Sequence, residues 1–160
     1  MKIKILALVT FIVSIVYSQD KKLYNPNDNA HQKIDSCISK AKKENKFILL
    51  QIGGNWCIWC IRFENLTQKS DVIKNILMNN FIVYHLNYSK ENKNESILAN
   101  LGFPQRFGFP VFVILNENGE RIHTQQSDFL EENNSGYDIK KVENFLNNWS
   151  PKALDPKLYK

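Results

Sequence analysis

Hydrophobic residues recur along the chain at spacings typical of strands and of helices. Short apolar runs rich in β-branched and aromatic residues predict strands. These runs are Phe47–Ile52, Phe81–Asn87, Val111–Leu115 and Arg121–Gln125. Phe47–Ile52 is almost continuously apolar, as in a strand that is covered on both faces. Asn118-Gly119, between the last two runs, is a strong signal for a tight hairpin, so we expect those strands to be antiparallel neighbours.

Between the strands, apolar residues recur every three to four positions, the spacing of one helical face. The stripe within Ala30–Lys46 includes Cys37, which there behaves as a small apolar side chain. The stretch from Cys57 to Asn80 can form one or two helices, with Ser70 as the cap of the second. Further helices are predicted at Glu95–Leu101 and Asp138–Trp149. This order predicts an α/β fold in which helices cover both faces of a mixed sheet.

The N-terminus has the pattern of a secretory signal peptide. Lys2 and Lys4 precede the apolar run Ile5–Val16, and the small residue Ser18 ends a cleavage-like pattern. The alternative is an uncleaved membrane anchor, but the run is shorter than the ~20 residues that span a bilayer. We therefore expect residues 1–18 to be removed and the protein to be extracytoplasmic, in the periplasm or secreted.

The rest of the chain has the composition of one globular domain. Residues 19–29 are polar and turn-rich, and we expect a flexible lead-in to a domain over residues 30–160. The formal net charge is +5, of which the predicted signal peptide supplies two, leaving +3. These charges are mild and scattered, so we do not expect a nucleic-acid partner. No apolar segment is left over after one domain is built, which makes a monomer the default expectation.

The cysteines limit which kinds of functional site the chain can form. Cys57 and Cys60 stand between a predicted strand and a predicted helix, and the third cysteine makes an odd total, so at least one is unpaired within the chain. Structural zinc needs four ligands, and the remaining cysteine and three histidines are not grouped at a ligand spacing, so no metal is expected. Attached haem would need histidine at position 61, which is isoleucine, and no other cofactor is indicated. A static disulfide would close a very small loop and stabilise the fold only weakly.

A redox role has a direct physical basis. A cysteine in the first turn of a helix faces the positive end of the helix dipole and unpaired backbone N–H groups, which favour the thiolate. On this hypothesis Cys57 attacks a substrate disulfide. Cys60, one turn deeper, then attacks the mixed disulfide and releases the reduced substrate.

The stretches FILLQIGGNWCIWC, FIVYHLN and FGFPVFVILNENGE, followed by an amphipathic helix, resemble the thioredoxin superfamily, and most closely its exported thioredoxin-like proteins. The resemblance covers Ala30 to Trp149. It implies a three-layer α/β/α sandwich with a central mixed sheet. It also implies thiol-disulfide oxidoreductase activity, in which Cys57 is the attacking cysteine and Cys60 the resolving one.

The same resemblance assigns residues around the cysteines. Trp56 matches the tryptophan that flanks the site, and Pro110 matches the cis-proline that lies against the disulfide. Phe109 is at the position whose backbone receives an extended substrate segment. Together with Trp59, these residues are expected to form an apolar rim that binds protein segments. Phe107 is expected to belong to the core instead.

Three residues or pairs depart from the family pattern. Gln51 occupies the position of a buried carboxylate and has no proton to exchange near neutral pH. Ile58-Trp59 differs from the Gly-Pro of thioredoxin, so reduction, oxidation and isomerisation all stay open. His85 is either a group that titrates near neutral pH or a half-buried strand histidine with a hydrogen bond.

We therefore predict an exported protein-disulfide oxidoreductase, acting as a reductase, with protein thiols and disulfides as substrates and a membrane or soluble redox partner. Two alternatives stay open. One is a redox-inert protein-binding module of the same fold, which the amide at Gln51 supports. The other is a carrier of a soft metal ion such as Cu(I), bound by the two thiolates.

Overall fold

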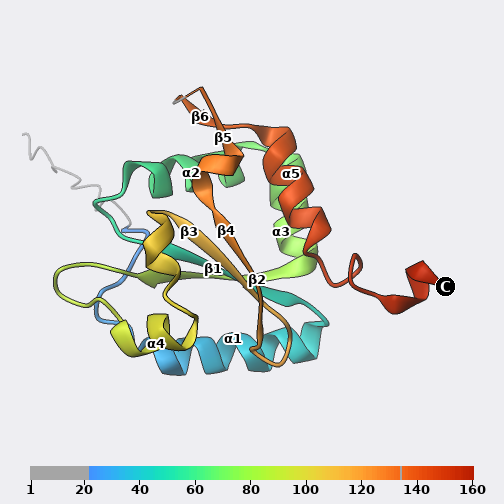
Figure 1. Ribbon diagram of the computed structural model, residues 1–160, viewed down its shortest axis with the longest axis horizontal. Coiled ribbons are helices and arrows are strands. Elements are labelled where there is room, and N and C mark those ends of the chain that lie inside the picture. The colour runs from blue at the N-terminus through green and yellow to red at the C-terminus, as the bar shows by residue number, and fades with distance from the viewer. Residues whose placement is uncertain (1–21, 134) are drawn as a thin grey trace, which may run out of the picture.

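The centre of the molecule is a four-stranded sheet with the order β2-β1-β3-β4 (Figure 1). It is seen in a computed structural model, which describes residues 22–133 and 135–160. The strands are β1 (Phe47–Gly53), β2 (Phe81–Asn87), β3 (Val111–Leu115) and β4 (Arg121–Gln126). β1 pairs parallel with β2 and antiparallel with β3, and β3 pairs antiparallel with β4. The predicted mixed sheet is confirmed. The predicted signal peptide, residues 1–18, lies outside the described residues.

Helices cover both faces of the sheet and make three layers (Figure 1). α1 (Ala30–Glu44) and α4 (Glu95–Asn100) lie on one face, and α2 (Ile58–Lys69), α3 (Asp71–Asn80) and α5 (Ile139–Asn148) lie on the other. Successive residues of β1 point alternately to the two faces, as a strand requires. Leu50 therefore packs in the α1 core, while Leu49 packs in the core under α2, α3 and α5.

Local sequence explains where the helices end. Ser70 is the C-terminal cap of α2 and the N-terminal cap of α3, where its Oγ accepts a hydrogen bond from Ile73 N. The stretch from Cys57 to Asn80 therefore forms two helices. α1 stops at Glu44 rather than Lys46 because Asn45 adopts a left-handed backbone. Several short elements were not expected. They are three 3₁₀ helices (Pro104–Phe107, Ser127–Leu130 and Pro156–Tyr159) and the pair β5 (Glu131–Glu132) and β6 (Gly136–Tyr137).

Packed structure begins earlier than the expected start near Ala30. Residues 22–29, here called the strap, run past the end of the sheet where α2 begins (Figure 1). The side chain of Tyr24 in the strap is fully buried. Asn55 holds the strap by its backbone, because its Oδ1 accepts from Tyr24 N at 3.0 Å and its Nδ2 donates to Tyr24 O at 2.7 Å. The second half of the expected lead-in is therefore part of the folded domain.

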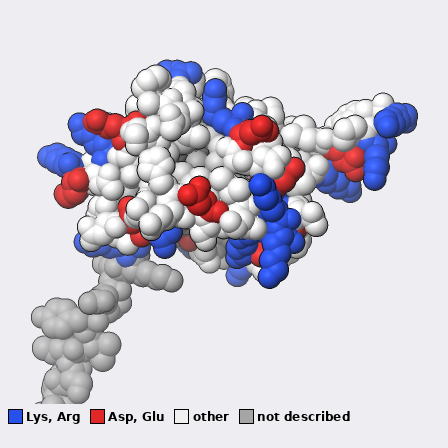
Figure 2. All heavy atoms as spheres, turned by 90° about the horizontal axis from the view of Figure 1, so that it is seen from below, with Lys and Arg blue, Asp and Glu red and all other residues white. Residues whose placement is uncertain are grey.

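Charged side chains are interspersed on the face that carries α1. Figure 2, which views the molecule from that side, shows basic and acidic groups side by side without a continuous surface of one sign. This distribution fits the expectation of solvated charges. Within residues 22–133 and 135–160, no helix has both the length and the apolar character needed to cross a bilayer.

Candidate redox site

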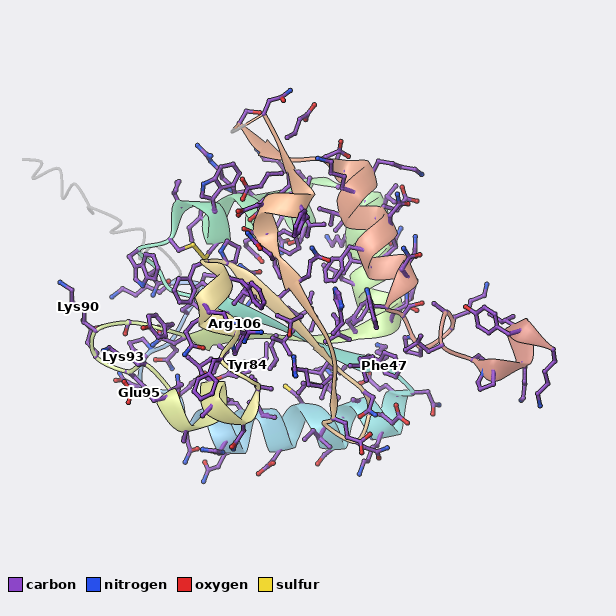
Figure 3. All side chains as sticks on the ribbon, viewed as in Figure 1. Phe47, Tyr84, Lys90, Lys93, Glu95 and Arg106 are labelled. Atoms are coloured by element: carbon purple, nitrogen blue, oxygen red, sulfur yellow. A yellow bond between two sulfur atoms is a disulfide. The ribbon has the colours of Figure 1, made fainter. Side chains whose placement is uncertain are left out.

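Cys57 and Cys60 form a disulfide at the beginning of α2 (Figure 3, yellow bond), with their Cα atoms 5.2 Å apart. Cys57 is the residue that caps the helix, one position before its first turn, and its Sγ accepts a hydrogen bond from Cys60 N at 3.1 Å. The sulfur therefore lies at the positive end of the helix dipole. Cys57 keeps 4% of its surface exposed and Cys60 none, so a thiol or disulfide arriving from solvent reaches Cys57 first.

Two glycines let the end of β1 pass close to the site. A Cβ on Gly53 would collide with Cys60 Sγ and would lie 3.0 Å from Tyr24 Oη. A Cβ on Gly54 would collide with the indole of Trp56. The Gly53-Gly54 pair that interrupts the apolar run is therefore required by close packing of the backbone against the disulfide and its neighbouring indole.

A buried amide lies on the inner side of the disulfide. Gln51 in β1 is 1% exposed, and its Nε2 donates to Tyr24 Oη at 2.9 Å and to Cys60 O at 3.1 Å. These bonds join the sheet, the strap and α2. Burial raises the pKa of Tyr24 far above its ordinary value, and the hydrogen bond from Gln51 opposes only part of that effect, so the hydroxyl stays protonated near neutral pH.

Glu64 and His85 line a cavity next to Gln51. The cavity, of about 280 Å³, lies between α2, α3 and the outer strand β2. His85 Nε2 is 3.4 Å from Glu64 Oε2, and the His85 ring meets the Tyr24 ring edge-on with centroids 5.6 Å apart. The His85 imidazole lowers the pKa of the Glu64 carboxyl, while desolvation acts in the opposite direction. His85 is half-buried beside this carboxylate, but its Nε2 makes no hydrogen bond to a described residue, so the hydrogen bond expected for a strand histidine is not formed.

Aromatic side chains form a wall beside Cys57. In this aromatic wall, made of Trp56, Tyr88 and Phe109, the rings of Trp56 and Phe109 meet nearly at right angles with centroids 5.3 Å apart. Phe109 stacks on Tyr88 at 4.7 Å, and Trp56 Nε1 donates to Tyr88 O at 2.8 Å. Phe109 also packs against the two cysteines, and its peptide bond to the buried Pro110 is cis. Trp56 is fixed in place yet 59% exposed, which suits a surface that binds a partner.

The expected rim is only partly assembled. Trp59 packs against the cysteines but turns its ring to Tyr137, at 5.6 Å and edge-on, and carries the Arg62 guanidinium 4.5 Å from its centroid. Phe107 is partly buried and packs against the core under α1, as expected. The structure therefore brings Trp56 and Phe109 together and places Trp59 in a separate aromatic contact.

The described part of the chain offers few other candidate sites. No three His, Cys, Asp or Glu side chains there lie close enough together to hold a metal ion. The third cysteine, Cys37, is free and half-buried in α1, and burial raises the pKa of its thiol.

Sequence reasoning did not single out Tyr24 or Asn55. A local signal existed, because Leu23 and Tyr24 are the only apolar residues between Gln19 and Asn29. An apolar pair in an otherwise polar segment indicates an anchor to the folded body. Its target could not be read from the pattern, since Tyr24 meets residues 27 and 31 positions away.

Comparison with known proteins agrees with this geometry. A family model described as thioredoxin-like matches residues 29–117, more than half of the chain, whereas no curated protein matches it. The structure is similar to a disulphide isomerase from Xylella fastidiosa Temecula1, with a TM-score of 0.68 and 19% identity over 78% of this chain and 94% of that one. It is also similar to the oxidised C-terminal domain of DsbD from Neisseria meningitidis, with a TM-score of 0.50 and 18% identity over 76% of this chain and 96% of that one.

At these identities the two solved structures show a shared fold. The fold they share is the three-layer arrangement around a mixed sheet described above, which confirms the architecture that the sequence pattern and the resemblance predicted. The family match covers the strap's last residue, the cysteine pair and the first three strands. The chain belongs to the thioredoxin-like family.

Proposed function

We propose that the protein is a thiol-disulfide oxidoreductase that exchanges electrons with other proteins through Cys57 and Cys60. The observation that carries the proposal is the disulfide at the start of α2, with Cys57 at the cap and 4% exposed and Cys60 fully buried. Membership of the thioredoxin-like family supports the same activity. The asymmetry of the two sulfurs gives them different roles.

In the reducing direction the cycle has two exchanges. The Cys57 thiolate attacks one sulfur of a client disulfide, and the other client sulfur leaves as a thiolate with the electron pair of the broken bond. The Cys60 thiolate then attacks Cys57 Sγ, which forms the Cys57–Cys60 disulfide and releases the second client sulfur. Two electrons have passed from the cysteine pair to the client, and the oxidising direction is the reverse. The helix dipole and Cys60 N–H stabilise the negative charge on Cys57 that the first step needs.

The aromatic wall is the proposed binding surface for clients. Trp56 and the partly buried Phe109 offer apolar surface next to the reactive sulfur, and an extended or unfolded segment can lie against such a surface. Pro110, which is buried and follows Phe109, is the third residue of this proposed site. A second hollow, of about 230 Å³, adjoins the exposed indole and is bordered by Trp56, Tyr88, Ser89, Lys90 and Lys93. The two lysines stand on the loop between β2 and α4 (Figure 3). Trp59, in its separate contact, is the remaining proposed substrate-binding residue.

We further propose that the protein works outside the cytoplasm as a monomeric reductase. The charged and apolar pattern of residues 1–18 supports export. Outside the cytoplasm a dithiol must be kept reduced by a dedicated partner, so a reductase there needs a membrane-bound or soluble electron donor.

Reduction of insulin by dithiothreitol, followed by turbidity, tests the activity. Wild-type protein is expected to accelerate it and Cys57→Ser to abolish the acceleration, while Cys37→Ser is the matched control and should keep full activity. Cys60→Ser should accumulate a mixed disulfide at Cys57, visible by mass spectrometry. Full activity in Cys57→Ser would refute the proposal. Titration of the cysteine pair against glutathione then measures its reduction potential. A potential near about −270 mV indicates a reductase, and one near about −120 mV indicates a disulfide donor.

Two observations favour a second candidate, a redox-inert protein-binding module of the same fold. Gln51 supplies no proton-exchanging group, and the disulfide is almost wholly enclosed, with only 4% of Cys57 exposed. A binding module would hold its partner equally well with and without dithiothreitol. Its affinity would also be unchanged by Cys57→Ala.

A further inference from the structure

The hydroxyl of Tyr24 is buried in the redox site, where it accepts a hydrogen bond but donates none to a described residue. Its oxygen accepts a hydrogen bond from Gln51 Nε2 at 2.9 Å, but within residues 22–133 and 135–160 its O–H donates to no acceptor. A buried donor without an acceptor is costly, and native structures rarely keep one. Among the described residues, the disulfide form therefore leaves this donor open to an acceptor that reduction creates.

The sulfur of Cys60 is the group that fits. Tyr24, Cys57 and Cys60 pack together as one buried cluster. A Cβ on Gly53 would collide with Cys60 Sγ and would lie 3.0 Å from Tyr24 Oη, so the sulfur and the hydroxyl both lie beside one point. A sulfur within a disulfide is a weak acceptor, whereas a thiolate accepts strong, charge-assisted hydrogen bonds.

We infer that Tyr24 donates a hydrogen bond to Cys60 Sγ when the disulfide is reduced, and so stabilises the thiolate that resolves the mixed disulfide. The inference rests on the proposed function and assigns Tyr24 a role in the second exchange. In that step Cys60 Sγ bonds to Cys57 Sγ, the bond from Cys57 to the client breaks, and the client sulfur leaves with the electron pair. Tyr24 keeps its proton throughout. It loses its acceptor only when Cys60 Sγ returns to the disulfide.

The surroundings of Tyr24 prepare it for this role. Burial raises the pKa of its hydroxyl well above the usual range, so the hydroxyl is protonated and able to donate near neutral pH. The amide of Gln51 donates to the same oxygen, which polarises the O–H bond and strengthens it as a donor. Asn55 fixes the backbone of Tyr24 with two hydrogen bonds, so the hydroxyl is held in place before the sulfur is released.

Tyr24→Phe tests the inference because it keeps the ring and removes only the hydroxyl. The reduced form should lose stability relative to the disulfide, which moves the equilibrium constant with glutathione about tenfold toward the disulfide, equal to about 30 mV lower potential. Release of a thionitrobenzoate group attached to Cys57, the step that Cys60 performs, should slow about tenfold at neutral pH. Its half-maximal rate should also move to higher pH, which a loss of packing alone would not cause.

Tyr159→Phe is the control. Tyr159 lies in the 3₁₀ helix Pro156–Tyr159, away from the cysteine cluster, and its exposed hydroxyl donates to Ala153 O at 2.6 Å, so its substitution should change none of these quantities. If wild type equilibrates with glutathione and Tyr24→Phe shows the wild-type constant and release profile, the inference alone is overturned. If wild type never equilibrates with glutathione, the proposed function fails and the inference fails with it.

Discussion

Gly53→Ala tests how tightly the end of β1 packs against the disulfide. Gly53 is fully enclosed and its backbone is not left-handed, so alanine meets no backbone strain there and the whole cost comes from the added Cβ. That atom would collide with Cys60 Sγ and would stand 3.0 Å from the hydroxyl and 3.4 Å from Cζ of Tyr24. None of these neighbours is the loose end of a flexible surface side chain.

The magnitude follows from these contacts. Forcing an extra carbon into a closed core costs about 1–3 kcal/mol, and a sulfur fixed by a disulfide cannot turn away, so we expect a cost in the upper half of that range. Replacing glycine with alanine also restricts the unfolded chain, which raises the unfolding free energy by roughly 0.4–1 kcal/mol. The oxidised protein should therefore lose about 1–2.5 kcal/mol of unfolding free energy. After reduction Cys60 Sγ can adopt another rotamer, so the loss should be smaller with dithiothreitol present.

Urea unfolding, followed by tryptophan fluorescence in the oxidised and the reduced protein, measures both differences. Gly136→Ala is the control, because a Cβ there has open space and its backbone is also not left-handed. That variant should match wild type or exceed it by up to about 1 kcal/mol. If Gly53→Ala were as stable as wild type when oxidised, the strand end would not be packed against the sulfur, and the argument that places Tyr24 beside Cys60 would lose its geometric basis.

Three further substitutions test other parts of the site. Asn55→Ala removes both hydrogen bonds that hold the strap, so urea unfolding should show a loss of about 1–2 kcal/mol, and limited proteolysis should cleave the strap first. The folded pKa of Glu64 is lowered beside His85, so its contribution to stability is present above the unfolded pKa and is lost as pH falls through the folded pKa. Glu64→Gln should therefore reduce unfolding free energy near neutral pH but not in acid, and an unchanged difference across that range would contradict the pairing. Trp56→Ala should weaken binding of an unfolded client about tenfold in a fluorescence titration, with little effect on stability. Phe129, another exposed aromatic residue, is the control, and Phe129→Ala should leave client binding unchanged.

Most of the sheet could be predicted because its strands are short and strongly patterned. β3 is buried at every position, and β2 is bounded by a helix end on one side and a polar loop on the other, so both runs were read with their observed bounds. Ser70 is a strong helix cap, and the same serine ends one helix and begins the next. Where the local signal and the tertiary packing agree, sequence alone places the element.

The site was less readable because its contacts join distant segments. The spacing of Cys57 and Cys60 indicates a redox pair, but Tyr24, which completes their surroundings, lies 33 positions before Cys57. The direction of Trp59 also escaped the pattern. The helix begins at Ile58 and turns the indole toward Tyr137, which belongs to a two-residue strand that the sequence does not signal.

The amide at Gln51 changes which functions the other residues of the site must supply. An ionised carboxylate at that depth would oppose a second negative charge on Cys60, whereas a neutral amide does not. Gln51 uses its N–H groups to hold Cys60 O and Tyr24 Oη, so it orients the buried cysteine and its neighbouring hydroxyl without taking part in proton exchange. Gln51 offers no base, so the proton that Cys60 loses passes to another acceptor, such as water or the client sulfur released in the first exchange. Orientation of the buried cysteine and removal of its proton are therefore tasks of different groups.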